Sequence, residues 1–557
     1  MLCSSKIPYR FSRAFSHGTF QKKQYLSDLL PLSLIVTYIT YMDEAAFQSL
    51  PAHVRAFTNP DFYPHPASDI TMLQTHISWV FLAGSFAYKV KKPLNLGFLD
   101  FTTRAKRLQT CCDELTLNRR LAPGIYLEVL PLFQHDDVYI LGSELKHHQD
   151  AVDYCLKMVR FDQRDLFDVR LMEARFDPAW MDLLAETIAD FHLHAENSPY
   201  IQKFGEPRFL YNHIEANLTI AKNCLQQDLS PSLLSGLKRK SKAWLDRFQT
   251  MIEQRQGQFV KNCHGDLHLK NITLFNNRPT PFDCIEFSDE FRMIDTMNDA
   301  AFLVMDCDSR NRSDLGYRFL SRYLEQCGDY DGLKLLPLYL SYRAGVRGKV
   351  ACLLEGELAN DSSVDQTQQQ ETHDSVQHYF SLADQYLTSG QRPELFIIGG
   401  LSGSGKSHLA LLALQYISAV IIRSDATRKR IARDHPDLPL YSNEMHRLTY
   451  QAMFDAAEKT LEAGFSVILD ATFLYPASRE RAAELGSAQK VPWHFYWLDI
   501  DSETLRARVG RREEDGRDIS DAGLKVLEGQ LVTYKRPAEP YIEFISDSDH
   551  WPQALNP

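Results

Sequence analysis

The sequence predicts two folds in succession, a mixed α+β part followed by an α/β part. Between residues 77 and 161, strand and helix patterns follow in the order strand, strand, helix, strand, strand, and mainly helical patterns then run to about residue 387. From residue 395 onward, strands and helices alternate, which is typical of a parallel sheet with helices on both faces. A phosphate-handling motif occurs in each part, so the chemistry divides in the same way as the folds.

Length and composition limit the kinds of protein this chain can be. At 557 residues it is too long for one hydrophobic core. Its net charge of −11 argues against a general affinity for nucleic acid or anionic membranes, so we predict neither as a stable partner. The ten cysteines contain no CxxC pair, which favours reduced thiols in a cytoplasmic protein over a zinc site or a disulfide framework.

The first 41 residues differ from the rest of the chain. No acidic residue occurs before Asp28, and the apolar run from Leu29 to Tyr41 is too short to span a membrane. We expect residues 1–41 to be a disordered or spurious extension and Met42 to be the true start. A targeting segment is the alternative.

The α+β part begins with short alternating strands. Lys89 and Lys91 share a face of the second strand, because side chains alternate along a strand. Glu114 lies at the edge of the apolar stripe of the following helix. The predicted elements are strands Ile77–Leu82 and Phe86–Lys91, helix Thr103–Leu121, and strands Tyr126–Leu132 and Tyr154–Phe161.

Helical patterns dominate the chain after residue 183. Residues 356–375 are polar and predict a surface segment or linker. We predict a first domain over residues 42–390, with a small lobe to about 161 and a large lobe from about 162, and a second domain over residues 391–557. The predicted elements are helices Leu183–Ala195, Leu233–Gln254 and Tyr379–Leu387, strands Gln258–Asn262, Ile272–Phe275 and Pro281–Asp283, then strands Leu395–Ile398, Ala419–Ser424, Ser466–Asp470 and Trp493–Ile500 with helices Ala477–Leu485, Glu503–Arg511 and Asp521–Tyr534.

The first phosphate site is predicted around His264-Gly-Asp-Leu-His-Leu-Lys-Asn271. Phosphoryl transfer needs a carboxylate that orients and deprotonates the acceptor hydroxyl, and oxygen ligands that hold Mg²⁺ on the phosphates. Asp266 suits the first role, whereas Asn271 and Asp283 suit the second. The spacing of Asp266 and Asn271 matches that of the kinase catalytic loop.

With this motif and with Asp283-Cys-Ile-Glu286, the chain resembles the aminoglycoside phosphotransferase family, which has a two-lobed, protein-kinase-like fold. The resemblance implies that Lys89 or Lys91 contacts the phosphates of ATP and that Glu114 pairs with that lysine. The sequence leaves the choice open with a slight preference for Lys89. One departure is that no G-x-G-x-x-G precedes the lysines.

The second phosphate site is the segment Gly400-Leu-Ser-Gly-Ser-Gly-Lys-Ser407, which fits G-x-x-x-x-G-K-[ST] between a strand and a helix. Such a loop turns its backbone N–H groups around phosphate oxygens, its lysine reaches the β- and γ-phosphates, and its serine ligates Mg²⁺. We therefore predict ATP and Mg²⁺ as cofactors. The candidate ATP-binding residues are Gly400, Ser402, Gly403, Ser404, Gly405, Lys406 and Ser407, of which Lys406 is also a catalytic candidate and Ser407 a metal ligand.

Further residues complete this second site. Asp470 ends an apolar strand and is a candidate Mg²⁺ ligand, Asp425 is a candidate catalytic base, and Arg428 is a candidate anion-binding residue. Five arginines close together predict a lid over the transferred phosphate. Arg511 stands for this group among the ATP-binding candidates, because the sequence does not show which arginine contacts the phosphate. These arginines are Arg506, Arg508, Arg511, Arg512 and Arg517.

On these motifs the second part resembles zeta-toxin-like and polynucleotide-kinase-like P-loop kinases. The whole chain resembles bacterial fusions of an aminoglycoside phosphotransferase with a P-loop ATPase of the AAA family. We expect an ATP-dependent phosphotransferase with two modules, each of which moves the γ-phosphate to a hydroxyl of a small-molecule acceptor. The alternatives are that one module is a nucleotide-binding switch for the other, or that the second module is a nucleic-acid end kinase or zeta-toxin-like kinase.

Overall fold

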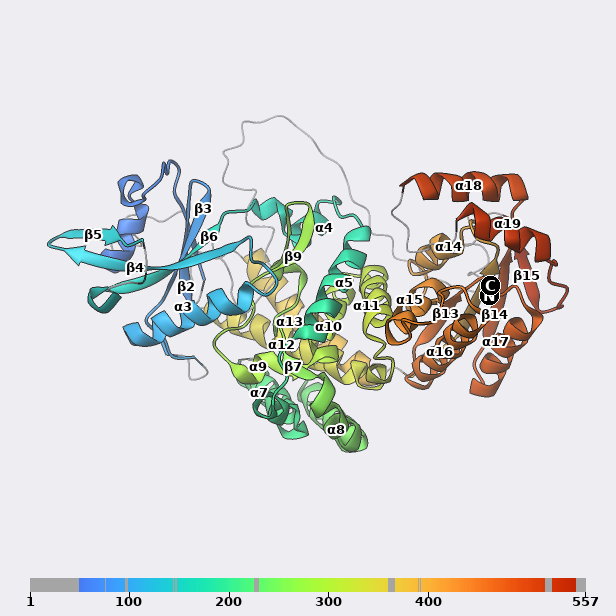
Figure 1. The fold of residues 1–557 in the computed structure, drawn as a ribbon. Helices are drawn as coiled ribbons and strands as arrows, with labels where there is room; N and C mark the ends of the chain where they lie inside the picture. Colours follow the sequence, from blue (N-terminus) through green and yellow to red (C-terminus); the bar gives the residue numbers. More distant parts are fainter. Residues whose placement is uncertain are drawn as a thin grey trace, which may run out of the picture. The chain divides into compact units, whose positions relative to one another are not determined.

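The computed structural model describes residues 50–75, 77–95, 99–143, 145, 148–224, 230–358, 366–388, 390, 392–515 and 523–546 (Figure 1). The expectations for residues 1–41 and Met42, and for Arg517, lie outside these residues. We call residues 50–388 the N-terminal part and residues 395–546 the C-terminal part. Within the described ranges, no helix is both long enough and apolar enough to cross a membrane.

The N-terminal part begins with an antiparallel sheet in the order β1-β2-β3-β6-β4-β5. One face carries an aromatic core that includes Phe57, Phe81 and Tyr88. Helix α3 packs against β4 and β6. The elements are α2 (Ala52–Arg55), η2 (Ala56–Thr58), η3 (Pro60–Phe62), β1 (Thr71–Gln74), β2 (Ser78–Ala83), β3 (Phe86–Lys91), α3 (Arg104–Asn118), β4 (Tyr126–His135), β5 (Val138–Leu141), η4 (His148–Asp150) and β6 (Asp153–Val159).

Helices make up most of the remaining N-terminal part. Asn276 and Asn277 close the hairpin between β8 and β9 with φ of +49° and +63°. The elements are η5 (Gln163–Asp165), α4 (Phe167–Met172), α5 (Ala179–His194), α6 (Pro199–Gln202), η6 (Lys203–Gly205), α7 (Pro207–Cys224), α8 (Pro231–Phe259), β7 (Val260–Asn262), η7 (Leu269–Asn271), β8 (Ile272–Phe275), β9 (Arg278–Pro281), α9 (Asp289–Arg292), β10 (Met293–Asp295), α10 (Thr296–Asp308), α11 (Ser313–Cys327), η8 (Asp331–Lys334), α12 (Leu336–Leu358) and α13 (Gln366–Thr388).

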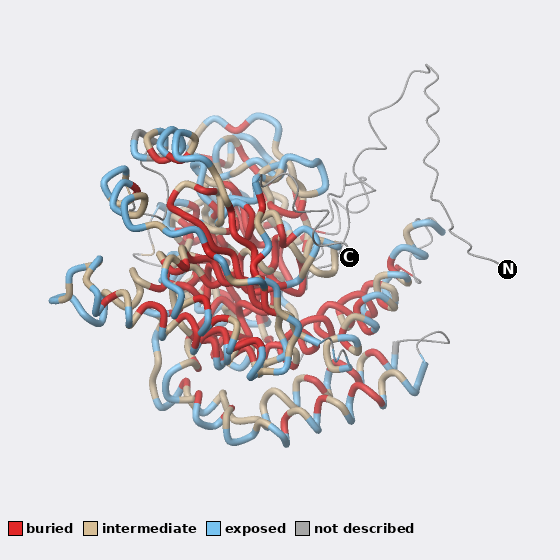
Figure 2. The backbone as a smooth tube through the Cα atoms, turned by 90° about the vertical axis from the view of Figure 1, so that its right-hand side faces the viewer, coloured by how far each residue is buried: buried red, intermediate tan, exposed pale blue. Residues whose placement is uncertain are grey.

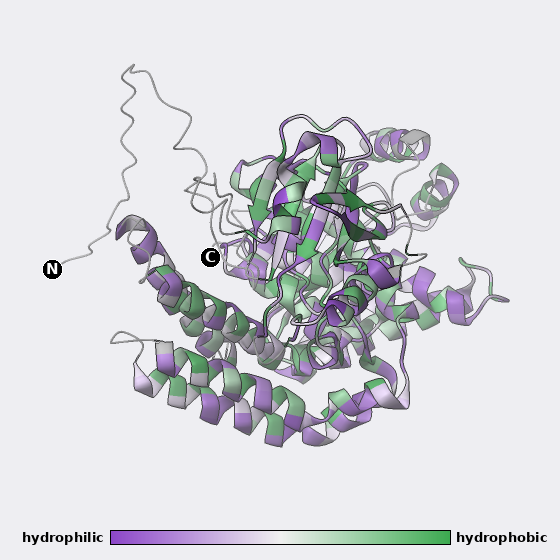
Figure 3. Ribbon diagram, turned by 90° about the vertical axis from the view of Figure 1, so that its left-hand side faces the viewer, coloured by the Kyte–Doolittle hydropathy of each residue, from purple (hydrophilic) through white to green (hydrophobic). Residues whose placement is uncertain are grey.

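For residues 356–375 the sequence predicted a surface segment or a linker, and the linker alternative is wrong for most of this range. Helix α12 continues to Leu358, and α13 already begins at Gln366. The polar residues of α13 share the helix with a buried stripe that includes Thr372, Val376 and Phe380, and this stripe packs against α12. Packing of one apolar face stabilises a helix whose composition alone does not predict it. Other helices of the molecule show the same mixture of hydrophilic and hydrophobic residues (Figure 3).

The C-terminal part is a parallel sheet in the order β12-β13-β11-β14-β15, with helices on both faces. Helix α14 packs on one face against Phe396 and Ile398, and Tyr450 of α16 reaches Phe495 on the other face through Phe473. The strands are buried along most of their length (Figure 2). The elements are β11 (Leu395–Gly400), α14 (Lys406–Ala413), β12 (Ala419–Arg423), α15 (Ser424–Asp434), α16 (Asn443–Glu462), β13 (Ser466–Asp470), α17 (Pro476–Gln489), β14 (Trp493–Leu498), α18 (Ser502–Asp515), α19 (Leu524–Thr533) and β15 (Ile542–Ile545).

This architecture confirms the predicted fold class of an α+β part followed by a P-loop-type parallel sheet. The sequence missed four strands, β1, β5, β10 and β15, each three or four residues long. Runs this short contain too few residues to establish an alternating pattern. The edge strand β12 packs against α11 of the N-terminal part. The domain boundary near residue 390 stays a prediction.

Candidate active sites

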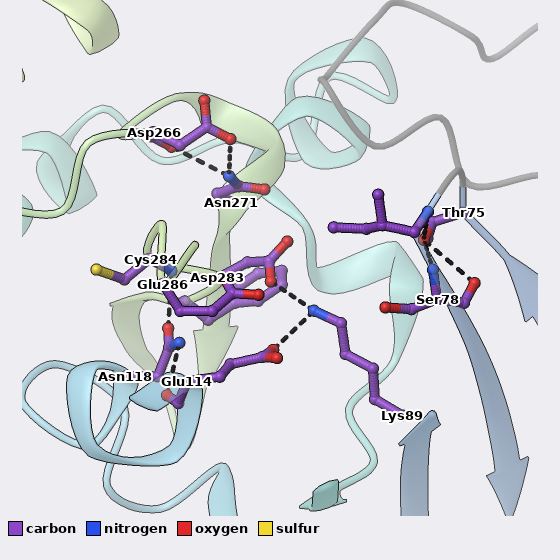
Figure 4. Close-up of polar contacts among 12 residues, drawn as sticks. Thr75, Ser78, Lys89, Glu114, Asn118, Asp266, Asn271, Asp283, Cys284 and Glu286 are labelled. Carbon is purple, nitrogen blue, oxygen red and sulfur yellow. Dashed lines mark hydrogen bonds and ion pairs between the residues drawn. The ribbon is translucent and has the colours of Figure 1, made fainter. Parts of the chain in front are cut away.

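Lys89 of β3 connects the two lobes of the N-terminal part. Its Nζ lies 2.7 Å from Oε1 of Glu114 on α3 and 2.8 Å from Oδ1 of Asp283, which follows β9 (Figure 4). Burial alone lowers the pKa of this lysine, but the charges of Asp283 and Glu114 outweigh it and raise the pKa. Lys89 is therefore held as a cation between a small-lobe carboxylate and a candidate metal ligand.

Lys91 lies on the same face of β3 and forms a second set of ion pairs. Its Nζ is 2.6 Å from Oε2 of Glu114 and 2.5 Å from Oε1 of Glu286. The Lys91 side chain is fully buried. Burial raises the pKa of Glu286, whereas the two lysines outweigh burial and lower the pKa of Glu114 to about 2. The structure thus brings both candidate lysines to Glu114, and only Lys89 to Asp283.

Asp266 and Asn271 lie together on the loop that follows β7. The Asn271 Nδ2 donates to Oδ2 of Asp266 at 2.8 Å and to its backbone oxygen at 3.0 Å. The side chain of His268 lies 3.3 Å from the same carboxylate. Burial raises the pKa of Asp266, but His268 and His264 outweigh it, and the pKa is about 2. The candidate base is an ionised carboxylate at neutral pH.

Asp299 on α10 anchors the start of the loop from His264 to Asn271, which we call the catalytic loop. Its two carboxylate oxygens accept the backbone N–H groups of His264 (3.0 Å) and Gly265 (2.9 Å). The His264 Nε2 donates to the carbonyl oxygen of Phe282, so it braces the segment that leads to Asp283. Arg343 of α12 donates to the carbonyl oxygen of Gly265 at 3.0 Å. The sequence had not assigned Asp299 to this loop.

Asp283 has a left-handed backbone with φ of +61°. Its N–H donates to the Tyr126 hydroxyl at 3.1 Å, and the next N–H, of Cys284, donates to Oδ1 of Asn118 at 2.8 Å. The backbone N–H of Phe282 donates to the Asn271 carbonyl oxygen, which ties this segment to the catalytic loop. Tyr126 and Asn118 are site residues that sequence reasoning missed, because no local motif contains them.

No Gly-rich loop precedes the lysines in the sequence. In the structure, an ordinary turn connects β1 to β2 in this region. The Thr75 Oγ1 accepts the N–H groups of Ile77 and Ser78 at 3.3 and 2.9 Å, and donates to the Ser78 carbonyl oxygen (Figure 4). Thr75 and Ser78 were not among the candidates. Recognising β1 as a strand would have placed this turn between the first two strands, one strand before the strand that carries the lysines.

The P-loop of the C-terminal part connects β11 to α14. Gly400, Gly403 and Gly405 have φ of +144°, +82° and +97°, values that L side chains rarely adopt. A Cβ on Gly403 would lie 2.7 Å from the Val509 side chain. The glycines of the motif are therefore required by the backbone path and by the close approach of α18.

Lys406, Ser407 and Asp470 come together at the carboxyl ends of β11 and β13. The Ser407 hydroxyl donates to Oδ2 of Asp470 at 2.5 Å, and Lys406 Nζ donates to the Leu401 carbonyl oxygen at 2.9 Å. Burial raises the pKa of Asp470. A hydroxyl and a carboxylate in contact are the donor types that hold Mg²⁺ in P-loop proteins, so these residues fit the predicted metal.

The acceptor-side candidates lie at the end of β12. Arg428 Nη1 donates to Oδ1 of Asp425 at 2.7 Å, within the first turn and a half of α15. The last residue of β12, Arg423, is in register with Asp470 of β13. The structure therefore brings Asp425 and Arg428 together, beside the strand that carries Asp470.

The predicted arginine lid is helical over its described residues. Leu505 and Val509 of α18 pack on Leu401 and on Leu527 of α19. Arg508 Nη1 donates to the Ser404 carbonyl oxygen of the P-loop at 3.3 Å. Arg511 is exposed, and Arg506 forms an exposed ion pair with Glu528. Among the described arginines of this segment, Arg508 is the one that reaches the P-loop.

Comparisons with known proteins give one family match and two mycobacterial relatives. Residues 395–537 match the family described as an AAA domain. Uncharacterized proteins of Mycobacterium tuberculosis (strain H37Rv) and Mycobacterium bovis are each 30% identical over 479 residues, which cover 82% of this chain and 91% of theirs.

Solved structures show weaker likenesses. A choline/ethanolamine kinase family protein from Mesorhizobium loti is 12% identical and covers 60% of this chain and 98% of its own, with a TM-score of 0.35. An APS kinase of Mycobacterium tuberculosis, in complex with AMPPNP and APS, is 20% identical and covers 30% and 96%, with a TM-score of 0.23. These TM-scores are low, so the fold assignment rests on strand order and motif geometry. On that basis the chain joins a protein-kinase-like part to a P-loop part.

Proposed function

The chain belongs to the same family as these mycobacterial proteins, and we propose that it is an ATP-dependent phosphotransferase with two catalytic centres. Each centre transfers the γ-phosphate of ATP to a hydroxyl group of a small molecule. The observation that carries the proposal is that residues far apart in the sequence meet in both centres. Lys89 meets Glu114 and Asp283 in one, and Ser407 meets Asp470 in the other.

In the N-terminal centre, Lys89 supplies the positive charge that would hold the α- and β-phosphates, and Glu114 fixes its position. The two lysines and three carboxylates of this network carry one net negative charge, which suits a bound cation. Asn271 and Asp283 would hold Mg²⁺, which neutralises charge on the phosphates. Asp266 accepts the hydrogen bond of the acceptor hydroxyl.

The low pKa of Asp266, about 2, makes it a weak base. It orients the hydroxyl first and takes its proton as the bond to phosphorus forms. That order suits a loose transition state, in which the attacking oxygen needs little activation before bond formation. Positioning, rather than strong basicity, is then the main contribution of Asp266.

In the C-terminal centre, backbone N–H groups of the P-loop and Lys406 would bind the phosphates, while Ser407 and Asp470 would hold Mg²⁺. Asp425 takes the acceptor proton, and Arg428 orients that carboxylate through their 2.7 Å contact. Arg508 reaches the P-loop from α18 and is placed to neutralise developing charge on the transferred group.

We propose small-molecule acceptors and a cytoplasmic location, where ATP is available. The net charge of −11 supports the exclusion of nucleic acid and membranes as stable partners.

The test is an ATP-consumption screen of the full chain against sugars, aminoglycosides, nucleosides and RNA ends. We expect Asp266→Ala to lower one product-forming activity by about 10²–10⁴-fold and Lys406→Ala to lower a different one by about 10²-fold or more. The unchanged activity in each variant is the control for correct folding. If either substitution leaves ATP turnover and every product unchanged, the corresponding centre is not a kinase, and a nucleotide-binding switch becomes the better description of that part.

A further inference from the structure

Glu325 of α11 is a fully buried carboxylate in the N-terminal part, but its strongest partner belongs to the C-terminal part. Arg423 donates to it through Nε and Nη2, each at 2.6 Å and each to a different carboxylate oxygen. Arg322 adds a third contact at 3.0 Å. A two-pronged arginine–carboxylate pair fixes direction as well as distance, because both groups are planar and rigid.

Arg423 lies in the P-loop centre, directly before the helix that carries the acceptor-side candidates Asp425 and Arg428. It is the last residue of β12, lies in register with the candidate Mg²⁺ ligand Asp470, and is the N-cap residue of α15. Asp425 and Arg428 follow in the first turns of that helix. The Arg423 side chain is therefore fixed at the point where α15 leaves the sheet, two residues before the candidate base Asp425.

Helix α11 also holds the strand itself. The backbone N–H of Ile421, in the middle of β12, donates to the Ser321 hydroxyl at 2.9 Å. Tyr317 of the same helix packs against the apolar core formed by β11, β12 and α14. The backbone and the terminal side chain of β12 are thus both attached to one helix of the N-terminal part.

Other polar contacts between the two parts are of a different kind. Asp331 with Lys459, at 2.6 Å, and Lys334 with Glu462, at 3.0 Å, are ion pairs between largely exposed side chains. Pairs of that kind contribute little to structure in water. The Glu325 side chain is 0% exposed and that of Arg423 is 14% exposed, so their pair lies within the packed interface.

From this arrangement we propose that Glu325 is a positioning residue of the C-terminal centre. It holds Arg423, and through it the start of α15, so that Asp425 faces the transferred phosphate. The N-terminal part therefore supplies one element of the other part's catalytic geometry. This inference rests on the proposed phosphotransfer at the P-loop.

The experiment uses the full chain carrying Asp266→Ala, which leaves the C-terminal centre as the source of ATP turnover. ATP with water as the acceptor is the probe, and AMPPNP reports nucleotide affinity. We expect Glu325→Gln to lower Lys406-dependent ATP hydrolysis at least tenfold and to change AMPPNP affinity less than threefold. A purely structural role would weaken both together. Arg423→Gln should have the same effect, and the double variant should be no worse than either single variant.

The matched control is Asp331→Asn, which breaks an exposed pair of the same interface and should leave turnover within twofold. Hydrogen–deuterium exchange of residues 419–428 gives a second readout that needs no activity, and Glu325→Gln should speed exchange there and leave residues 395–400 unchanged. Lys406-dependent turnover that survives Glu325→Gln overturns the proposal. If no turnover depends on Lys406, the proposed function fails, and unchanged exchange in residues 419–428 would then overturn the positioning role independently.

Discussion

The two candidate centres of this chain are built by opposite means. The N-terminal centre uses side-chain charges, with Lys89, Lys91, Glu114, Asp283 and Glu286 drawn from three separate segments into one ion-pair network. The C-terminal centre relies on a continuous stretch of backbone, in which Gly400, Gly403 and Gly405 take left-handed conformations. One centre is assembled by tertiary structure, whereas the other is largely specified by eight consecutive residues.

This difference determines what each centre is sensitive to. A network of buried charges is destabilised when one member is removed, because a remaining buried charge is left without a partner. A backbone cradle is insensitive to most side-chain changes but does not accept a Cβ at its glycines. Three predictions test this contrast, from the largest expected effect to the smallest.

Of the two lysines of the N-terminal centre, Lys89 should matter mainly for ATP turnover and Lys91 mainly for the free energy of unfolding. In the Lys406→Ala background, we expect Lys89→Met to lower ATP turnover about 10²-fold, since the cation next to Asp283 is lost. Lys91→Met should instead lower the free energy of unfolding by about 3–5 kcal/mol, because Glu286 loses its buried partner. Steady-state kinetics and urea unfolding of both variants make the comparison. The opposite pattern would identify Lys91 as the ATP-contacting lysine.

Asp299 should make the stability of the N-terminal part depend on pH. Burial raises the pKa of Asp299, but the hydrogen bond and charge of His192 outweigh it, so the folded-state pKa is lowered. The carboxylate therefore stabilises the fold above the ordinary aspartate pKa of about 3.9, and this contribution is lost as the pH falls below that value.

We accordingly expect Asp299→Asn to cost about 1–3 kcal/mol at pH 7, since one N–H of the catalytic loop loses its acceptor. The difference between variant and wild type should shrink as the pH falls through the range below 4. Urea unfolding at a series of pH values measures both effects. The control is Asp246→Asn, which removes an exposed carboxylate from α8. A pH-independent difference would show that charge is not the reason for the effect.

The arginines of α18 should differ according to their contact with the P-loop. In the Asp266→Ala background, Arg508→Ala should lower ATP turnover about tenfold, or ~1.4 kcal/mol, because it removes the guanidinium next to Ser404. Arg511→Ala should change turnover less than about twofold, since its side chain is exposed. Equal effects would mean that α18 acts through overall charge and not through a particular contact.

The same contrast explains how much could be predicted from the sequence. Residues 400–407 and the loop from His264 to Asn271 were identifiable because their chemistry is local, and the fold class followed from the order of strands and helices. The sequence could not distinguish Lys89 from Lys91, since they differ in their contact with Asp283, which is almost two hundred residues away. Asp299 and Arg508 likewise acquire their roles only through packing.

Weak local sequence signals account for the remaining differences between the predicted and the observed elements. Strands β1, β5, β10 and β15 are too short to be recognised by alternation, so the Thr75 turn remained unnoticed. The polar start of α13 resembles a linker until Phe380 and its neighbours pack on α12. The contacts of α11 with β12 could not be foreseen, because Ser321 and Glu325 look like ordinary polar residues of an amphipathic helix.

The cover that α11 provides for β12 has a consequence for handling the protein. Without α11, the outer side of β12 would present unpaired backbone groups on a strand that is apolar from Ala419 to Ile422. Such an edge is a template for pairing with another copy. A fragment that begins after Thr388 should therefore self-associate more than the full chain does. Expression of the isolated P-loop part tests this expectation, because aggregation that the full chain does not show would be attributable to the uncovered edge of β12.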